Sequence, residues 1–195
     1  MERLTPNDAA ILELEDDISA AHGLTLGIFE GPEPTFDELQ VLLEERVRLC
    51  PRYRQRVVPV PFGIERPVWN DDPNFSIEFH LRHTALPERE HRDSLKAFVS
   101  RQLSQRLDRG KPLWELWFVS GLDDGRWALA SKVHYAIIDG VSGTELLGLL
   151  ADSVETHPQA GVRMPRPLPS DRQLLTRAVM DLAFDPIEMV RTARG

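Results

Sequence analysis

The chain has 195 residues, of which 42% are hydrophobic and 28% charged, which is enough apolar material for one folded core and a connecting segment. Its formal net charge of -8 and its pI of about 5.3 argue against a general affinity for nucleic acid phosphates. The single cysteine, Cys50, excludes an intrachain disulfide and a cysteine-based zinc cluster, and it suits a reducing compartment.

The N-terminal stretch MERLTPNDAAILELEDD is acidic and lacks the basic start and apolar run of a signal peptide. No apolar run approaches the roughly 20 residues that a membrane-spanning helix needs. The sequence therefore predicts a cytoplasmic protein and leaves open a peripheral contact with the inner face of the membrane.

The first half of the chain alternates helix and strand patterns. Residues 6–17 predict a short helix capped by Asn7 or Asp8, and residues 24–31 predict a strand that ends in a Gly-Pro turn. Thr35 and Glu38 form a T-x-x-E capping box, and apolar residues at helical spacing follow it as far as residue 50. Residues 51–73 are rich in proline and arginine and predict loops and short extended pieces. The alternation of FSIEFHLRH, 75–83, predicts a strand.

The second half predicts a helix over 94–107 and a hairpin of strands 113–120 and 126–135, joined by a turn at 121–125. Ser142 and Glu145 form a second capping box for a helix over 143–153. A proline-rich linker and a helical pattern over 171–194 follow. We therefore expect a mixed α/β fold, a two-layer sandwich with helices packed on a mixed sheet, over residues 1–155. Residues 156–195 are expected to form a linker and connecting arm.

The stretch SKVHYAIIDGVSG, 131–143, holds the candidate site. Each of its residues also has a structural explanation: a histidine beside a buried strand is usually a satisfied core residue, and Asp139-Gly140 is a common turn pair. His80 and His83 lie three apart on a predicted strand and so point to opposite faces, which argues against a shared metal ion. No metal site is expected.

Taken together, these residues favour a functional interpretation. H-Y-A-I-I-D-G resembles the HHxxxDG motif of the acyltransferase superfamily built on the chloramphenicol-acetyltransferase fold. The flanking stretches agree as well: RLDRGKPLWELW, GLDDGRWALASKVH, DDPNFSIEFHLRH and PRYRQR. With them, nearly the whole chain is similar to the bacterial wax ester synthase/diacylglycerol acyltransferase family.

The resemblance implies transfer of a fatty acyl group from acyl-CoA to the hydroxyl of diacylglycerol or a fatty alcohol, without a metal or a bound organic cofactor. Aligned on Asp139, the first motif histidine is His134, and Tyr135 stands where the family has its general base. Asp139 is implied to hold the loop by pairing with an arginine, and Gly140 to let the backbone turn close to the substrate. Peripheral contact with a membrane or lipid droplet is implied by the lipid substrates.

Tyr135 is the first departure from the family pattern. Histidine has a pKa near 6.5 and a phenol near 10, so at pH 7 a phenol is about a thousandfold poorer as a base, or roughly 4 kcal/mol. General-base help is typically worth about 100- to 10,000-fold, so the substitution can remove most of it. Two alternatives follow. In the first, His134 acts as the general base in place of Tyr135. This requires a bulge or turn that starts at Val133, because strand neighbours point to opposite faces. Otherwise Tyr135 donates a hydrogen bond to the developing oxyanion.

The second departure is length, because the resemblance covers the first half and the bridging arm only. We expect the family's second half, which supplies one wall of the substrate tunnel, to be absent, so that a second polypeptide or homologue completes the site or the product is truncated and inert. A lone half would also expose apolar surface. The alternative function is a non-catalytic acyl-binding or scaffolding half that pairs with an active homologue. Condensation domains of peptide synthetases share the motif, but PLWELW and DDPNF argue against that reading.

Overall fold

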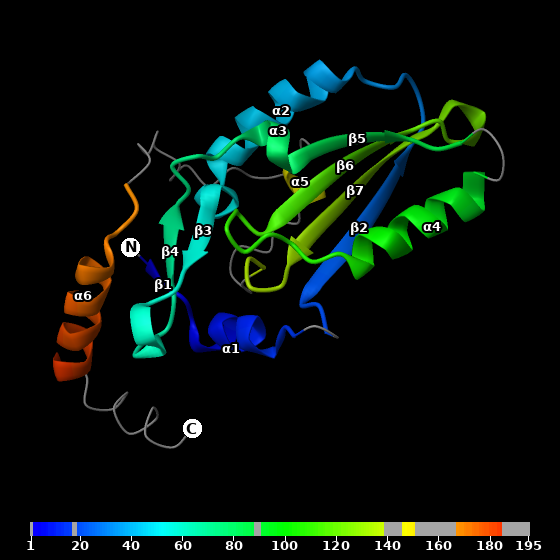
Figure 1. Cartoon of the computed structure of the whole chain (residues 1–195). Coiled ribbons are helices and arrows are strands. Elements are labelled where there is room, and N and C mark those ends of the chain that lie inside the picture. Colours follow the sequence, from blue (N-terminus) through cyan, green and yellow to red (C-terminus); the bar gives the residue numbers. More distant parts are fainter. Residues whose placement is uncertain (1, 17–18, 88–90, 139–145, 151–166, 185–195) are drawn as a thin grey trace.

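Two β-sheets form the frame of the computed structural model, which describes residues 2–16, 19–87, 91–138, 146–150 and 167–184. The larger sheet has four strands in the order β2 (His22–Phe29), β7 (Trp127–His134), β6 (Trp114–Ser120) and β5 (Leu81–Ala85) (Figure 1). The pairs β2–β7 and β6–β7 are antiparallel and β5–β6 is parallel. The sheet is therefore mixed, as predicted.

The smaller sheet comes mostly from the proline- and arginine-rich segment. It is antiparallel, in the order β1 (Glu2–Arg3), β4 (Val68–Asp71) and β3 (Gln55–Val58). Short helical turns lie beside these strands, η1 (Pro51–Arg54) and η2 (Pro61–Gly63). The short extended pieces expected between residues 51 and 73 are thus the strands of a second sheet.

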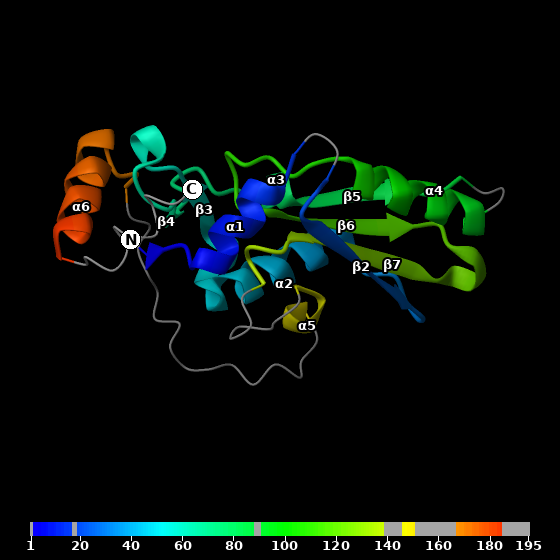
Figure 2. The same ribbon diagram turned by 90° about the horizontal axis from the view of Figure 1, so that it is seen from below.

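Helices cover both faces of the larger sheet (Figure 2). The helices α2 (Phe36–Leu49) and α5 (Leu146–Leu150) lie on one face, and α4 (His91–Ser104) lies on the other. The helix α1 (Pro6–Leu14) lies beside the end of the sheet where β7 finishes, and α6 (Asp171–Phe184) packs near η2. The mixed α/β class is confirmed. None of the helices in the described ranges is both long and apolar enough to cross a membrane.

Alternation along β6 divides the core between the two faces. Trp114, Leu116 and Phe118 belong to the main core cluster under α2, whereas Val119 belongs to a smaller cluster under α4. Successive strand residues point to opposite faces, so one strand supplies both clusters. Each fully buried side chain of this size contributes on the order of 1.5–3 kcal/mol to folding.

Several predicted elements are confirmed. Thr35 and Glu38 form the reciprocal capping box of α2, since the Glu38 N–H donates to Thr35 Oγ1 at 3.2 Å and the Thr35 N–H donates to Glu38 Oε2 at 2.8 Å. The hairpin of β6 and β7 is present, and α4 and α5 lie within or close to their predicted ranges. The second capping box, at Ser142 and Glu145, lies outside the described residues, and the division at residue 155 stays a prediction.

Two predictions about element ends were wrong. The cap of α1 is Thr5, whose Oγ1 accepts from the Asp8 N–H at 3.1 Å, and neither Asn7 nor Asp8 caps the helix. The segment 75–83 is not one strand, because a helical turn, α3 (Ile77–His80), precedes β5. That turn places the His80 ring on the Trp114 ring, 4.3 Å between centroids, a contact that sequence alternation does not encode.

Candidate functional site

The site is built at the end of β7, where the strand becomes a tight turn. The Ile137 N–H donates to the His134 carbonyl at 3.0 Å, and the Ile138 N–H donates to the Tyr135 carbonyl at 3.2 Å. The neighbouring segments hold this turn from both sides: the His134 N–H donates to the Leu113 carbonyl at 3.0 Å, and the Tyr135 N–H donates to the Ala21 carbonyl at 2.9 Å. The backbone of residues 134–138 is therefore fixed by four hydrogen bonds.

His134 points into the core and is fully buried. Its Nδ1 accepts the Ala136 N–H at 3.1 Å, so the proton of the neutral ring lies on Nε2. Nε2 faces Glu15 Oε2 at 3.7 Å, and the Glu15 side chain is only 2% exposed. Both ring nitrogens are thus directed at protein groups.

Arg109 holds the Glu15 carboxylate in place. Its Nε and Nη2 donate to Glu15 Oε2 at 3.0 and 2.7 Å, and Nη2 also donates to the Leu12 carbonyl at 2.6 Å. Burial by itself raises the pKa of Glu15, but the hydrogen bonds from Arg109 and Ala21 and the positive charge of Arg109 outweigh it and lower the pKa. Glu15 is therefore an anion at neutral pH.

The pKa of His134 is lowered to about 4, chiefly because burial disfavours the charged imidazolium. Arg109 and His22 act in the same direction, whereas Glu15 opposes them. His22 pairs directly with His134 across β2 and β7, and its Nε2 lies 3.0 Å from the Leu103 carbonyl. His134 is consequently a neutral ring at pH 7.

Tyr135 has the opposite environment. Its side chain is 48% exposed and lines a pocket of about 350 Å³, here called the tyrosine pocket. The ring lies against Gly23, where a Cβ atom would come within 3.2 Å of both Cε1 and Oη of Tyr135. The residues that line the tyrosine pocket are His22, Gly23, Leu24, Thr25, Tyr53, Leu103, Ser131, Val133, Tyr135, Ile138 and Leu146. His134 is not among them.

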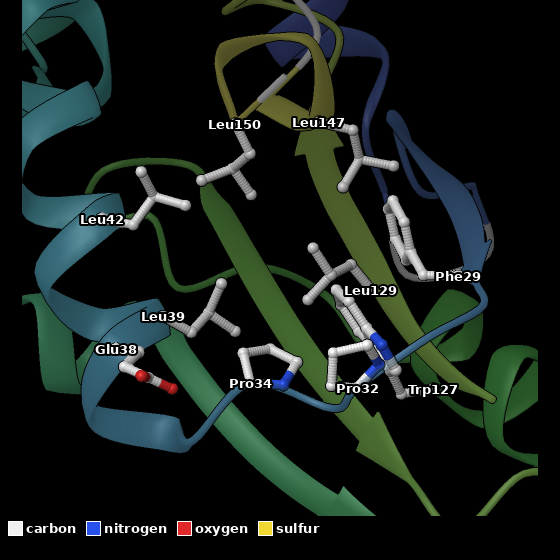
Figure 3. Close-up of a pocket in the computed structure, with 10 residues that line it drawn as sticks. All are labelled: Phe29, Pro32, Pro34, Glu38, Leu39, Leu42, Trp127, Leu129, Leu147 and Leu150. Carbon is white, nitrogen blue, oxygen red and sulfur yellow. The ribbon is translucent and has the colours of Figure 1, made fainter. Parts of the chain in front are cut away.

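A second pocket, here called the apolar pocket, is shown in Figure 3. It lies on the same face of the sheet as the tyrosine pocket, because its β7 residues Trp127 and Leu129 continue the alternation of Ser131 and Val133. It has a volume of about 310 Å³ and lies between α2, α5 and the ends of β2 and β7. Among the described residues that line it, Glu38 alone is charged, and the others are Phe29, Pro32, Pro34, Leu39, Leu42, Trp127, Leu129, Leu147 and Leu150. The Glu38 carboxylate is engaged in the capping box of α2, so the interior is apolar.

The two pockets are neighbours along β2. Gly23 borders the tyrosine pocket, and Gly27, where a Cβ atom would lie 3.5 Å from Leu147 Cδ1, borders the apolar pocket. Gly23 and Gly27 are four positions apart on the strand, which places both on one face about 13 Å apart. Consecutive residues of α5 line them as well, Leu146 the tyrosine pocket and Leu147 the apolar pocket.

The structure separates the predicted site residues. Strand alternation predicted that His134 and Tyr135 would not share one position, and they lie respectively in the core and at a pocket. Asp139 and Gly140 lie outside the described residues. The catalytic roles of all four stay predictions.

Sequence reasoning missed Glu15 and Arg109, which lie 94 residues apart and meet only in the fold. Arg109 belongs to the RLDRGKPLWELW stretch, but nothing in the sequence indicates its partner. His80 lies in the helical turn α3 and His83 in β5, where His80 Nδ1 donates to the Trp114 carbonyl at 2.7 Å and His83 Nε2 lies 2.9 Å from Ser120 Oγ. Within the described ranges, no cluster of three or more potential metal ligands occurs.

Solved structures with this fold define the class of protein. A condensation domain of the calcium-dependent antibiotic synthetase matches 76% of this chain and 37% of its own length with a TM-score of 0.60, at 18% sequence identity. The wax ester synthase/diacylglycerol acyltransferase from Marinobacter aquaeolei VT8 matches 72% of this chain and 36% of its own length with a TM-score of 0.58, at 33% identity. The chain thus has the fold that these acyltransferases and condensation domains share.

The sequence comparisons identify the family. The model of the wax ester synthase/diacylglycerol acyltransferase catalytic domain matches residues 4–195, so the chain belongs to that family. The probable diacylglycerol O-acyltransferase tgs1 of Mycobacterium tuberculosis is 39% identical over 155 residues, 78% of this chain and 33% of tgs1. The probable diacylglycerol O-acyltransferase tgs3 of the same organism is 35% identical over 188 residues, 94% of this chain and 69% of tgs3. The chain therefore spans about a third of the length of tgs1.

Proposed function

We propose that this chain acts in acyl-CoA-dependent O-acyl transfer, in which a long-chain fatty acyl group passes from coenzyme A to diacylglycerol or a fatty alcohol. The observation that carries the proposal is the placement of residue 135, the family's general-base position, at a pocket on the same sheet face as a second, apolar pocket. Membership of the family supports the reaction class.

The chemistry requires one proton acceptor. The acceptor alcohol gives up its proton, its oxygen attacks the thioester carbonyl, and the coenzyme A thiolate leaves and takes up a proton. In this proposal acyl-CoA is a co-substrate, and neither a metal ion nor a bound organic cofactor takes part. Diacylglycerol partitions into bilayers, so the reaction belongs at a membrane or lipid-droplet surface on the cytoplasmic side.

Tyr135 limits the rate in this scheme. A phenol is a poor base at neutral pH but a good hydrogen-bond donor, so the neutral Tyr135 phenol donates a hydrogen bond to the developing oxyanion. Only its phenolate form accepts the substrate proton. His134 does not replace it, because its ring is buried and both nitrogens face Ala136 and Glu15. Asp139 and Gly140 keep the roles that the family resemblance implies, Asp139 in holding the loop and Gly140 in turning the backbone.

The apolar pocket is proposed to hold the acyl chain. Its volume of about 310 Å³ is at the lower end of the range for small-molecule sites, and an alkyl chain gains free energy from an apolar lining without needing hydrogen bonds. Leu42→Trp fills this pocket from α2, whereas Val41→Trp, at an exposed position of the same helix, does not. We expect Leu42→Trp to weaken binding of palmitoyl-CoA but not of acetyl-CoA, as measured by calorimetry, and Val41→Trp to change neither. Equal binding of palmitoyl-CoA by both variants would refute the assignment.

Acyl transfer from labelled palmitoyl-CoA to diacylglycerol in vesicles tests the function. Tyr135→His is expected to raise turnover about 100-fold or more over the wild type, because general-base help typically contributes 100- to 10,000-fold. Tyr135→Phe controls for ring replacement and is expected to lower any wild-type turnover. A different outcome would show that His134 is the base: the wild type is active, Tyr135→His does not raise its activity, and His134→Ala abolishes it.

A second candidate function is favoured by Tyr135 itself. A chain with a phenol at the base position and the adjacent motif histidine, His134, in the core suits an acyl-binding or scaffolding half that pairs with an active homologue. The same assay separates the two candidates: silence of every variant, with palmitoyl-CoA still bound, supports the scaffold. Silence without binding contradicts both.

A further inference from the structure

We propose that Glu15 and Arg109 form a positioning pair that holds the turn after β7, so that residue 135 keeps its place at the tyrosine pocket. The catalytic meaning of this position rests on the proposed function, but the coupling between the pair and residue 135 does not.

The pair joins three segments that are distant in sequence. Glu15 is the C-cap residue of α1, Arg109 lies in the connection between α4 and β6, and His134 ends β7. The Leu12 carbonyl is one of the helix-end carbonyls that lack a partner within α1, and Arg109 Nη2 supplies a donor for it at 2.6 Å. Arg109 therefore fixes the end of α1 and the Glu15 carboxylate together.

Glu15 reaches residue 135 by two routes. The first route is through the side chain: Glu15 Oε2 faces His134 Nε2 at 3.7 Å, and His134 Nδ1 accepts the Ala136 N–H at 3.1 Å. The His134 ring therefore connects residues 134 and 136, which flank Tyr135. Through the backbone, Glu15 Oε1 accepts the Ala21 N–H at 3.4 Å, and the Ala21 carbonyl accepts the Tyr135 N–H at 2.9 Å. Both routes end at the residues that flank or hold position 135.

The charges around His134 explain why the positioning pair needs both Glu15 and Arg109. The groups that face its ring are Glu15, Arg109 and His22, and Lys132 lies on the same face of β7, where its Nζ donates to the Gln105 carbonyl. Without Glu15, the buried neutral ring would face only cationic or neutral groups, because the carboxylate 3.7 Å from its Nε2 would be gone. Without Arg109, a buried carboxylate would have no cationic partner. Either loss releases the ring that spans the turn.

The chain offers a direct probe, because it has only two tyrosines. Tyr53 is 4% exposed and Tyr135 is 48% exposed, so 3-fluorotyrosine labelling gives two fluorine resonances from distinct environments, and Tyr135→Phe assigns them. We expect Glu15→Ala to shift or broaden the Tyr135 resonance and to leave that of Tyr53 in place. Glu15→Gln, whose amide oxygen still accepts hydrogen bonds, is expected to give a smaller change.

An ion pair of equal length but with an exposed carboxylate provides a control at the N-terminus. Arg52 Nη2 lies 2.7 Å from Glu2 Oε1, the same separation as between Arg109 Nη2 and Glu15 Oε2. Glu2→Gln removes the charge from this pair and is expected to leave the Tyr135 resonance unchanged. Should Glu15→Ala not fold, Arg109→Gln releases the carboxylate from a side chain that is 51% exposed, with the same expected shift.

The proposal is overturned if folded Glu15→Ala or Arg109→Gln protein keeps the wild-type Tyr135 resonance. Kinetics in the Tyr135→His background add a second readout, since a positioning role predicts a roughly tenfold lower kcat for Glu15→Ala at an unchanged KM. A shifted resonance together with an inactive Tyr135→His parent would support the positioning pair and contradict the proposed function. Failure of the positioning pair and failure of the proposed function therefore give different experimental results.

Discussion

At the scale of single residues, the site depends on two neighbours that face opposite ways. Strand alternation alone predicts that His134 and Tyr135 diverge, and the structure agrees. The sequence does not reveal which of them is buried, because that depends on Glu15 and Arg109, whose contact forms only when α1 meets the connection before β6. The Tyr135 contact with Gly23 is equally invisible in the sequence, since β2 and β7 lie about a hundred residues apart.

Gly23 sets the position of the phenol. A methyl group there would lie 3.2 Å from Tyr135 Cε1 and Oη, closer than ordinary contact, so we expect Gly23→Ala to push the half-exposed ring outward. The expected change in stability is below about 1 kcal/mol, since alanine is favoured over glycine in a strand. The rate of modification of Tyr135 by a phenol-specific reagent measures the shift, with buried Tyr53 as the internal reference.

Gly148→Ala is the control for this prediction, because a Cβ atom there would have no neighbour within 4 Å. Unchanged Tyr135 reactivity in Gly23→Ala, or an equal change in Gly148→Ala, would contradict the predicted contact.

His80 makes the stability of the fold depend on pH. Burial lowers its pKa to about 4, so between that value and the usual 6.5 the unfolded chain binds more protons than the native protein. The contribution of the neutral, buried His80 to the unfolding free energy is fully present above pH 6.5 and is lost as the pH falls toward 4. The shift corresponds to about 3 kcal/mol at most.

We expect His80→Phe to reduce the loss of unfolding free energy between pH 7 and pH 4.5 by roughly 2–3 kcal/mol. The ring contact with Trp114 is retained in this variant, while the hydrogen bond to the Trp114 carbonyl is lost. Urea titrations at the two pH values measure the difference. An unchanged pH dependence would show that His80 is not protonated on unfolding in this range.

At the scale of elements, the sequence predicts what local chemistry determines. The capping box of α2 and the β6–β7 hairpin follow from adjacent residues and were predicted correctly. The helical turn of α3 was missed because FSIEFH alternates like a strand, and the contact of His80 with the distant Trp114 ring leaves no mark in that alternation. The cap of α1 was misplaced because Thr5 lies directly before Pro6, outside the apolar pattern that marked the helix.

The α2 cap supports one wall of the apolar pocket. Thr35→Ala removes the acceptor for the Glu38 N–H and is expected to lower the unfolding free energy by about 1 kcal/mol. Thr176→Ala in α6 is the comparison, since that hydroxyl only donates back to the Arg172 carbonyl of its own helix and is expected to contribute little. Equal losses in the two variants, measured by denaturant titration, would contradict a specific role for the cap.

At the scale of the whole molecule, β2 is one of the two edge strands of the larger sheet, β5 being the other. Its sequence, HGLTLGIF, contains no Asp, Glu, Lys or Arg, and among the described residues no strand pairs with its outer side. Long, uncharged edge strands are prone to pair with other chains. The family resemblance predicted exposed apolar surface, and half-exposed Ile28 and Phe29 lie on this strand.

We therefore expect the purified chain to self-associate as its concentration rises, and Ile28→Lys to reduce the association by placing a charge on the edge strand. Sedimentation velocity measures the distribution of species. Val41→Lys, at a similarly exposed apolar position on α2, is the matched control and is expected to leave association unchanged. A wild-type chain that stays monomeric, or an equal effect of both substitutions, would contradict the assignment to β2.

The central claim is that position 135 is where the substrate proton is accepted. The most direct test is the pH dependence of kcat/KM for acyl transfer by Tyr135→His, compared with Tyr135→Phe. We predict that the histidine variant gains activity as the pH rises through about 6.5, the usual pKa of an exposed imidazole, and that the phenylalanine variant shows no such step. Matching rates and matching profiles for the two variants would contradict the claim.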